Sequence, residues 1–317
     1  MRCRPGTTWL LLSLMGLGSQ TASAQTGGSI HAPGREAFHQ DVAWSPDASF
    51  IAYSEFSVGP DTSEKTWSIW IARADGSERR RVVDHATWVT WSPDGQRLAF
   101  ASERDGNSDI YTVSVDGENL RRITTDEASD SHPAWAPDGS RIAYVSGRGA
   151  HQELYTMTPA GDDVQQVSFG KTVYAMDDSG DITETYYAGD AQTPQWSAGS
   201  DRLVFYRSDG TSPDQVHVCA ANGSGEYSVT DDSLHNIYPS FVEDGLIAYS
   251  SRRPDGSNEL VTVMLDGTSR TPVGDVNAFF ARWSPDRTQI AFIAGRWPET
   301  AIYIMRVDDS QVRKIIN

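Results

Sequence analysis

The chain has 317 residues, a formal net charge of −17 at pH 7 and only two cysteines, Cys3 and Cys219. We expect neither nucleic acid nor an anionic lipid surface as a partner, because a chain with this negative charge would be repelled by both. Cys219 is the only cysteine beyond the first three residues, so we expect no internal disulfide. We predict that its thiol is buried and inert.

The first 24 residues have the pattern of a secretory signal peptide. Arg2 and Arg4 form a basic start, residues 9–17 form a short apolar run, and residues 22–24 (Ala-Ser-Ala) resemble a cleavage site. The apolar run is too short to span a bilayer, and no later segment is long and apolar enough, so we expect no membrane insertion. We predict a periplasmic or secreted protein in which residues 25–37 form an N-terminal segment.

From about residue 38 onward, one pattern occurs six times: an aromatic residue, a tight turn and an alternating apolar strand. The clearest copies are Trp-Ser-Pro-Asp-Gly at 91–95 and Trp-Ala-Pro-Asp-Gly at 135–139. The other copies begin at Trp44, Trp196, Phe241 and Trp283. The intervals are 47, 44, 61, 45 and 42 residues. Repeats of about 40–50 residues are typical of solenoids, propellers and arrays.

Each copy predicts four antiparallel strands, which in the second copy span residues 86–91, 97–102, 110–115 and 120–124. Pro-Asp-Gly at 93–95 and Asp-Gly at 116–117 supply the turns, and no helical periodicity lies between them. We therefore predict an all-β, six-bladed β-propeller over residues 38–317, with four antiparallel strands per blade. The blades are expected to start near residues 38, 85, 129, 190, 235 and 277.

The repeat aromatic residues should fill the wedges between neighbouring blades, where large apolar side chains stabilise most. We interpret them, together with the turns, as scaffold that touches no ligand. Each repeat contains all four of its own strands, so blade 1 is expected to close the ring by packing against blade 6. Residues 28–36 could instead add an edge strand.

Three features of the repeat resemble the TolB-like propeller family: the Trp-Ser-Pro-Asp-Gly turn, the following Leu/Ile-Ala-Phe/Tyr, and the Ile/Leu-Tyr-Thr strand before Asp-Gly. The resemblance covers about residues 38–317 and implies a propeller of the cell envelope. TolB proteins carry an additional α/β domain before the propeller. Only about 14 residues lie between Gln25 and the first repeat, so we expect a stand-alone propeller.

The first strand of a propeller blade lines the central channel, so residues shortly before each repeat aromatic are candidates for a ligand site at the channel mouth. Four of the seven histidines fall in the six-residue windows before these aromatics. The candidate ligand-binding residues are His39, Asp41, His85, Trp88, Asp130, His132, His235 and Tyr238. Neutral imidazoles suit a divalent metal or acid–base chemistry, with His132 and His235 as candidate metal ligands. Polar residues also line any wet channel, and we expect no cofactor unless these histidines share a metal.

The 61-residue interval contains an insertion at residues 171–192. Its candidate partner-binding residues are acidic or aromatic: Tyr174, Asp177, Asp178, Asp181, Tyr186 and Tyr187. A long insertion in a regular array is usually functional or merely tolerated. The insertion is therefore either a lid or partner-binding hairpin over the channel, or a solvated acidic loop.

Two functions follow from these patterns, and we expect the first in preference to an enzyme. It is an exported, monomeric binding or scaffold propeller that holds an envelope protein or peptide at the channel mouth. The alternative is a carbohydrate-active lyase or hydrolase that acts on an oligosaccharide at a histidine-lined channel site, with or without a metal. A regulatory propeller whose catalytic partner is a separate chain is a third reading. The sequence has no Gly-x-Ser-x-Gly, phosphate-loop or His-Glu-x-x-His motif.

Overall fold

The computed structural model describes residues 37–58, 65–149, 151–176, 182–188, 190–208, 212–296, 299–308 and 310–317. All of them belong to one compact unit, Arg35–Asn317. The predicted signal peptide, the N-terminal segment before residue 37 and the alternative edge strand at 28–36 lie outside these ranges. Within the described ranges there is no helix of the length and apolarity needed to cross a membrane.

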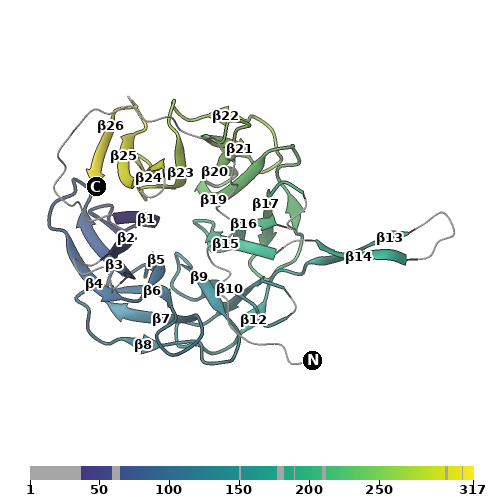
Figure 1. Ribbon diagram of the computed structural model, residues 1–317, viewed down its shortest axis with the longest axis horizontal. Coiled ribbons are helices and arrows are strands. Elements are labelled where there is room, and N and C mark those ends of the chain that lie inside the picture. Colours follow the sequence, from purple (N-terminus) through teal and green to yellow (C-terminus); the bar gives the residue numbers. More distant parts are fainter. Residues whose placement is uncertain are drawn as a thin grey trace, which may run out of the picture. The chain divides into compact units, whose positions relative to one another are not determined.

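Six antiparallel sheets of four consecutive strands surround a common centre, which confirms the predicted six-bladed, all-β propeller (Figure 1). Blade 1 consists of β1 (Ala37–Trp44), β2 (Phe50–Val58), β3 (Lys65–Arg73) and β4 (Arg80–Asp84). Blade 2 consists of β5 (Thr87–Trp91), β6 (Arg97–Ser102), β7 (Asp109–Ser114) and β8 (Arg121–Arg122). Blade 3 consists of β9 (Asp130–Trp135), β10 (Ile142–Ser146), β11 (Glu153–Met157) and β12 (Gln165–Gln166).

The second half of the ring repeats this order. Blade 4 consists of β15 (Asp190–Trp196), β16 (Arg202–Ser208), β17 (Gln215–Ala220) and β18 (Tyr227–Ser228). Blade 5 consists of β19 (His235–Glu243), β20 (Leu246–Arg252), β21 (Asn258–Met264) and β22 (Thr271–Pro272). Blade 6 consists of β23 (Ala278–Trp283), β24 (Gln289–Arg296), β25 (Glu299–Arg306) and β26 (Val312–Ile316).

The insertion between blades 3 and 4 forms a hairpin of its own. Strands β13 (Lys171–Met176) and β14 (Ile182–Ala188) pair with each other and make a separate two-stranded sheet (Figure 1). The side chains of Tyr174, Tyr186 and Tyr187 lie outside the described part of the chain, as do Asp177, Asp178 and Asp181. The role of this insertion in partner binding therefore stays a prediction.

The first turn of blade 2 follows the predicted chemistry. In blade 2 the Asp94 carboxylate accepts a hydrogen bond from the backbone N–H of Gln96 at 3.0 Å and a second from the Ser92 hydroxyl. These two bonds lower the pKa of Asp94, the hydroxyl contributing most. Gly95 follows with φ of 68°, which glycine adopts at little cost.

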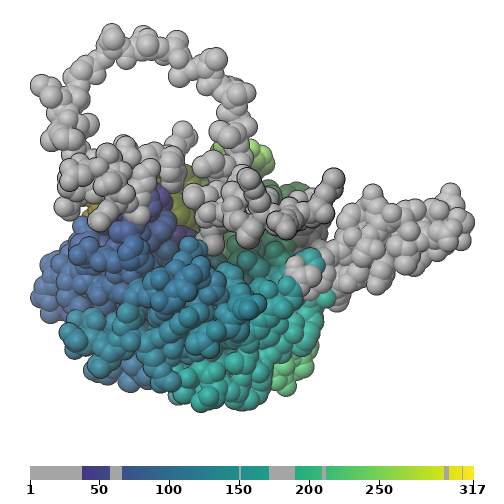
Figure 2. All heavy atoms as spheres, turned by 60° about the horizontal axis from the view of Figure 1, so that its bottom comes forward, coloured from purple at the N-terminus to yellow at the C-terminus, as the bar shows by residue number. Residues whose placement is uncertain are grey.

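The core lies in the wedges between blades, where buried apolar side chains from adjacent sheets interdigitate. Figure 2 shows the atoms of neighbouring blades in continuous contact along the outer surface. The second strands contribute the largest fully buried rings at equivalent positions: Tyr53, Phe100, Tyr144, Phe205, Tyr249 and Phe292. Cys219 is also buried, as predicted, and burial raises the pKa of its thiol to about 12, so it is protonated and unreactive at neutral pH.

The repeat tryptophans of blades 2 and 4 connect these blades to the ones before them. The indole N–H of Trp91 donates to the carbonyl of Ala43 at 3.2 Å, and the indole N–H of Trp196 donates to the carbonyl of Ala134 at 2.9 Å. In both pairs, the acceptor is the residue immediately before the repeat tryptophan of the preceding blade. The aromatics therefore join neighbouring inner strands as well as filling the wedges.

The same contacts close the ring between blades 1 and 6, as expected from the strand count. The indole N–H of Trp44 donates to the carbonyl of Arg282 at 2.9 Å. The backbone N–H of His39 donates to the Thr300 hydroxyl at 2.6 Å, and the imidazole Nδ1 of His39 contacts the Thr300 carbonyl at 3.1 Å. Among the described strands none is shared between the first and last blades, so closure depends on side-chain and turn contacts.

Candidate functional site: an axial cavity

Every inner strand is interrupted by a bulge two to four residues before its repeat aromatic. In blade 2, for example, the register with β6 shifts between Thr87 and Thr90. Five of the six residues three places before the aromatic have left-handed φ angles between 48° and 59°: Trp88, His132, Thr193, Tyr238 and Phe280. A side chain with a Cβ pays about 1–2 kcal/mol for this conformation. Strained bulges of this kind redirect side chains and are frequent beside functional sites.

The redirected side chains meet on the propeller axis and form an aromatic layer, defined by Trp88, His132, Tyr238 and Phe280. The ring centroids of Trp88 and His132 are 3.8 Å apart, those of Tyr238 and Phe280 are 5.1 Å apart, and those of Trp88 and Phe280 are 5.9 Å apart. Burial lowers the pKa of His132 to about 3, so this imidazole is neutral at physiological pH. The four rings therefore pack against one another as one layer.

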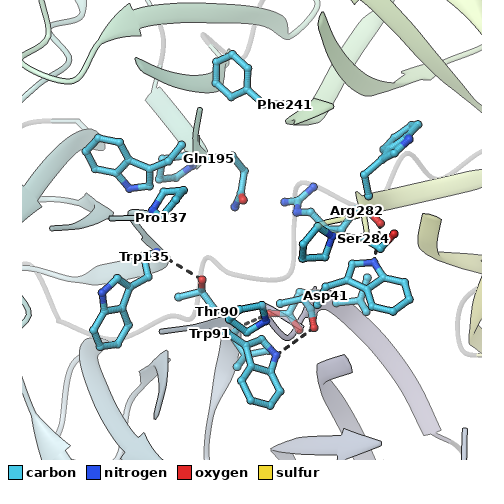
Figure 3. Close-up of a pocket in the computed structure, with 18 of the residues that line it drawn as sticks. Asp41, Thr90, Trp91, Trp135, Pro137, Gln195, Phe241, Arg282 and Ser284 are labelled. Carbon is cyan, nitrogen blue, oxygen red and sulfur yellow. Dashed lines mark hydrogen bonds between the residues drawn. The ribbon is translucent and has the colours of Figure 1, made fainter. Parts of the chain in front are cut away.

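A cavity of about 460 Å³ lies on the side of this layer toward which the inner strands end (Figure 3). Its walls are largely apolar and come from all six blades. They include the repeat aromatics Trp44, Trp91, Trp135, Trp196, Phe241 and Trp283. They also include prolines of the inner strands and turns: Pro46, Pro93, Pro133, Pro137, Pro194 and Pro285. Rigid, mostly apolar walls with a few polar groups are typical of ligand pockets.

The interpretation of the repeat aromatics as scaffold alone was therefore incomplete, because the same rings also line this cavity. The turns after the inner strands form its rim, where Pro46, Pro137, Ala198 and Pro285 are exposed. Inner-strand ends and turns from six copies necessarily meet around one axis, so a regular repeat builds a ring of nearly identical groups there. Differences between copies then decide what the cavity can bind.

Arg282 is the charged group that projects into this cavity most directly (Figure 3). The residue is only 8% exposed. Its Nη1 donates to the carbonyl of Ala281 at 2.9 Å and to the carbonyl of Tyr238 at 3.4 Å, and its guanidinium carbon lies 4.2 Å from the Phe280 ring centroid. Burial lowers the pKa of Arg282 to about 10, which leaves it a cation at neutral pH.

Asp41 is the buried acid of the same cavity, and its carboxylate is held by backbone groups. One oxygen accepts from the N–H of Ser54 at 2.8 Å, and the other accepts from the N–H of Val89 at 2.6 Å, which ties blade 1 to blade 2. Burial raises the pKa of Asp41 to about 6, while these hydrogen bonds and the charge of Arg282 oppose the rise. At pH 7 the carboxylate is therefore ionised, and its hydrogen bonds to the chain are already made.

The eight predicted channel residues separate into two groups. Asp41, Trp88 and His132 line the cavity, and Tyr238 packs in the aromatic layer beside it. The other four do not line it: they stand at or near the starts of inner strands, one to three residues before the bulge. They are His39, His85, Asp130 and His235.

These four residues have separate surroundings. His39 is 2% exposed and lies between Thr300 of blade 6 and Glu55, whose carboxylate is 3.4 Å from its Nε2. Asp130 is fully buried, with the guanidinium of Arg148 at 3.6 Å.

The two other histidines are at the surface. Nδ1 of His235 is 2.9 Å from the Asp214 carboxylate, and Nδ1 of His85 is 3.2 Å from the Thr66 hydroxyl. In the described part of the chain, no group of three or more His, Cys, Asp or Glu side chains is arranged to hold a metal ion. The structure thus gives each predicted histidine its own partner.

The family model described as the TolB beta propeller domain matches residues 40–281, more than half of the chain. This chain belongs to that family. A Tol-Pal system protein TolB from Thioalkalivibrio sulfidiphilus is 33% identical over 84 residues, which cover 26% of this chain and 19% of the relative.

Solved structures share the propeller fold at low identity. TolB from Acinetobacter baumannii aligns with a TM-score of 0.58 at 21% identity, over 73% of this chain and 53% of that chain. The β-propeller domain of the Trilobed protease from Pyrococcus furiosus, described as having an open velcro topology, aligns with a TM-score of 0.61 at 11% identity, over 89% of this chain and 96% of that domain. This TolB-like propeller thus spans 19% of the Thioalkalivibrio relative and 53% of the Acinetobacter structure, so their activities and partners enter only as proposals.

Proposed function

We propose that this TolB-like propeller is an exported, non-enzymatic binding protein of the cell envelope that holds a segment of a partner protein or peptide in its axial cavity. The observation that carries the proposal is the cavity itself, whose walls are tryptophan and proline side chains fixed by the ring. The Tol-Pal family of envelope proteins and the secretory pattern of residues 1–24 support the envelope location.

The chemistry of the walls suits a peptide. Indole and proline faces pack well against apolar and aromatic side chains, and tryptophan is among the residues that contribute most binding energy in interfaces. Trp44, Trp91 and Trp196 are held by hydrogen bonds to neighbouring blades, so these side chains lose little freedom when a ligand binds. A ligand inserted here would contact several blades at once.

A substitution that fills the cavity tests the proposal. Ala198 lines the rim at the position that proline occupies in four of the other repeats, and Ala198→Trp would obstruct the entrance. Ala160→Trp, in an exposed turn of blade 3 that does not line the cavity, is the matched control. The purified full chain is first used to capture a binding protein from the cell envelope. The captured protein is then purified and titrated against both variants by calorimetry.

We expect Ala198→Trp to weaken binding at least tenfold and Ala160→Trp to leave it unchanged, since about 1.4 kcal/mol of lost contact suffices for tenfold. Equal binding by both variants would place the partner elsewhere on the propeller and refute the proposal. Thermal unfolding of both variants provides the folding control.

The alternative of a carbohydrate-active enzyme has less support. It depended on histidines that act together, and the histidines named in the sequence have different partners. These are Thr300 and Glu55 for His39, Thr66 for His85, the Ser131 hydroxyl and the Trp88 indole for His132, and Asp214 for His235. His132 is also held neutral by burial in the aromatic layer. We therefore put forward no catalytic residues.

A further inference from the structure

We propose that the axial cavity selects a ligand with a carboxylate group, and that Arg282 binds this carboxylate while apolar neighbours of the same ligand pack on the tryptophan and proline walls. This inference rests on the proposed function and specifies the chemistry of the segment that is bound. The inference follows from one position of the repeat, where the six blades carry different side chains, and from a side-chain N–H group at that position that has no hydrogen-bond partner.

The position is the residue immediately before each repeat aromatic. The six copies place different side chains there: Ala43, Thr90, Ala134, Gln195, Ser240 and Arg282. Five of the six are small or neutral, and the sixth is a long cation. Figure 3 shows Gln195 and Arg282 pointing toward each other across the cavity. The ring of near-identical groups is thus broken by one positive charge.

The unsatisfied group is Nη2 of Arg282. It is buried and has no hydrogen-bond partner among the described residues, whereas Nη1 is bonded to two backbone carbonyls. A buried N–H without a partner carries a desolvation cost, and this cost is larger when the group is charged. A ligand that supplies an acceptor at this point recovers that free energy on binding.

The neighbouring acidic residues do not supply the acceptor that Nη2 of Arg282 lacks. Both oxygens of Asp41 accept from backbone N–H groups, and no hydrogen bond or ion pair joins it to Arg282 among the described residues. Glu243, at the rim, is paired with Arg287 at 3.0 Å. With Asp41 nearby, the cavity favours a single negative charge over a phosphate-like dianion. A planar carboxylate fits the guanidinium fork and leaves room for apolar flanks.

Small matched probes test the inference without any protein partner. The probes are 3-phenylpropionate and 3-phenylpropionamide, which share the ring and differ in the charged group. Both are titrated into the full chain by calorimetry, and the arginine side-chain NMR signals identify the group that is contacted. We expect the carboxylate to bind at least tenfold more tightly than the amide and to shift the Arg282 signal.

Variants assign the preference to Arg282. Arg282→Gln should abolish the difference between the two probes, and Arg282→Lys should retain part of it, because charge remains without the planar fork. Arg253→Gln removes an exposed arginine that pairs with Glu259 far from the cavity lining, and should leave the difference intact. Equal binding of the two probes, no binding up to their solubility limit, or a preference that survives Arg282→Gln would each overturn the inference.

Short peptides then distinguish the two sources of a carboxylate. Acetyl-Phe-Asp-Phe-amide carries the carboxylate on a side chain, and acetyl-Phe-Asn-Phe carries it at the free C-terminus. Acetyl-Phe-Asn-Phe-amide has no carboxylate. Binding of the first or second peptide alone identifies the source, and equal binding of all three contradicts the inference. If Ala198→Trp no longer binds a protein partner but Arg282→Gln binds it as tightly as the natural chain does, the proposed function stands and this inference is refuted.

Discussion

Gly76→Ala is the most direct test of how the ring closes. Gly76 lies in the turn between β3 and β4 with φ of +87°, and a Cβ there would lie 2.5 Å from the carbonyl oxygen of Ile315 in blade 6. The left-handed backbone alone costs alanine about 1–2 kcal/mol. The overlap with a backbone atom adds about 1–3 kcal/mol, because blade 1 or blade 6 must move. We therefore expect a total loss of about 3 kcal/mol in the free energy of unfolding.

The matched control is Gly256→Ala, since Gly256 has φ of +82° and no atom lies within 4 Å of the place that the added methyl group would take. It should lose only the backbone component, about 1 kcal/mol. In thermal unfolding these losses correspond to a decrease in Tm of roughly 6 °C for Gly76→Ala and roughly 2 °C for Gly256→Ala. Equal decreases would refute the reasoning, because they would show that blades 1 and 6 can move apart at their contact without a loss of stability.

Three further predictions concern the contact between blades 1 and 6, the strained bulge of an inner strand and a buried acidic residue. Trp44→Phe removes the indole N–H donated to blade 6 and should lower the free energy of unfolding by about 1–2 kcal/mol in a denaturant titration; an unchanged midpoint would contradict this. Thr193→Gly should be more stable than Thr193→Ala by about 1 kcal/mol, because φ is 48° there, and the order should reverse at Thr156 within β11; the same order at both sites would argue against strain. Burial raises the pKa of Asp130 from 3.8 to about 6, so the folded state holds its proton more tightly and the stability from this group falls as pH rises from about 4 to 6. Asp130→Asn should therefore gain on the order of 2 kcal/mol over the natural chain between pH 4 and pH 7, and parallel stability curves would reject that pKa.

The fold could be predicted because its signals are local. A turn such as Pro93-Asp94-Gly95 determines its own geometry through a side-chain hydrogen bond and a positive φ, and the repeat interval then counts the blades. The short outer strands were harder to place: residues 120–124 were predicted as a strand, whereas β8 contains only Arg121–Arg122. Strand ends depend on pairing with neighbours, which a local pattern does not contain.

The site was predicted only in part, because distance along a strand does not show which end of a channel is open. The windows before each aromatic included three residues that line the cavity, Asp41, Trp88 and His132, but the prediction gave most weight to histidines. The cavity instead lies where the inner strands end. Arg282 was missed because it directly precedes Trp283, in the part of the repeat interpreted as scaffold. A comparison of the six residues at that position would have shown one arginine among small and neutral side chains.

The position before the repeat aromatic combines two roles that do not interfere. In three copies its backbone carbonyl accepts the indole N–H of the next blade: Ala43 does so for Trp91, Ala134 for Trp196 and Arg282 for Trp44. Any amino acid can supply that carbonyl, so the hydrogen bond places no demand on the side chain. The side chains at this position differ from blade to blade, and four of them line the cavity: Ala43, Thr90, Gln195 and Arg282. The hydrogen bond that closes the ring therefore does not constrain the side chain at position 282, where an arginine lines the cavity.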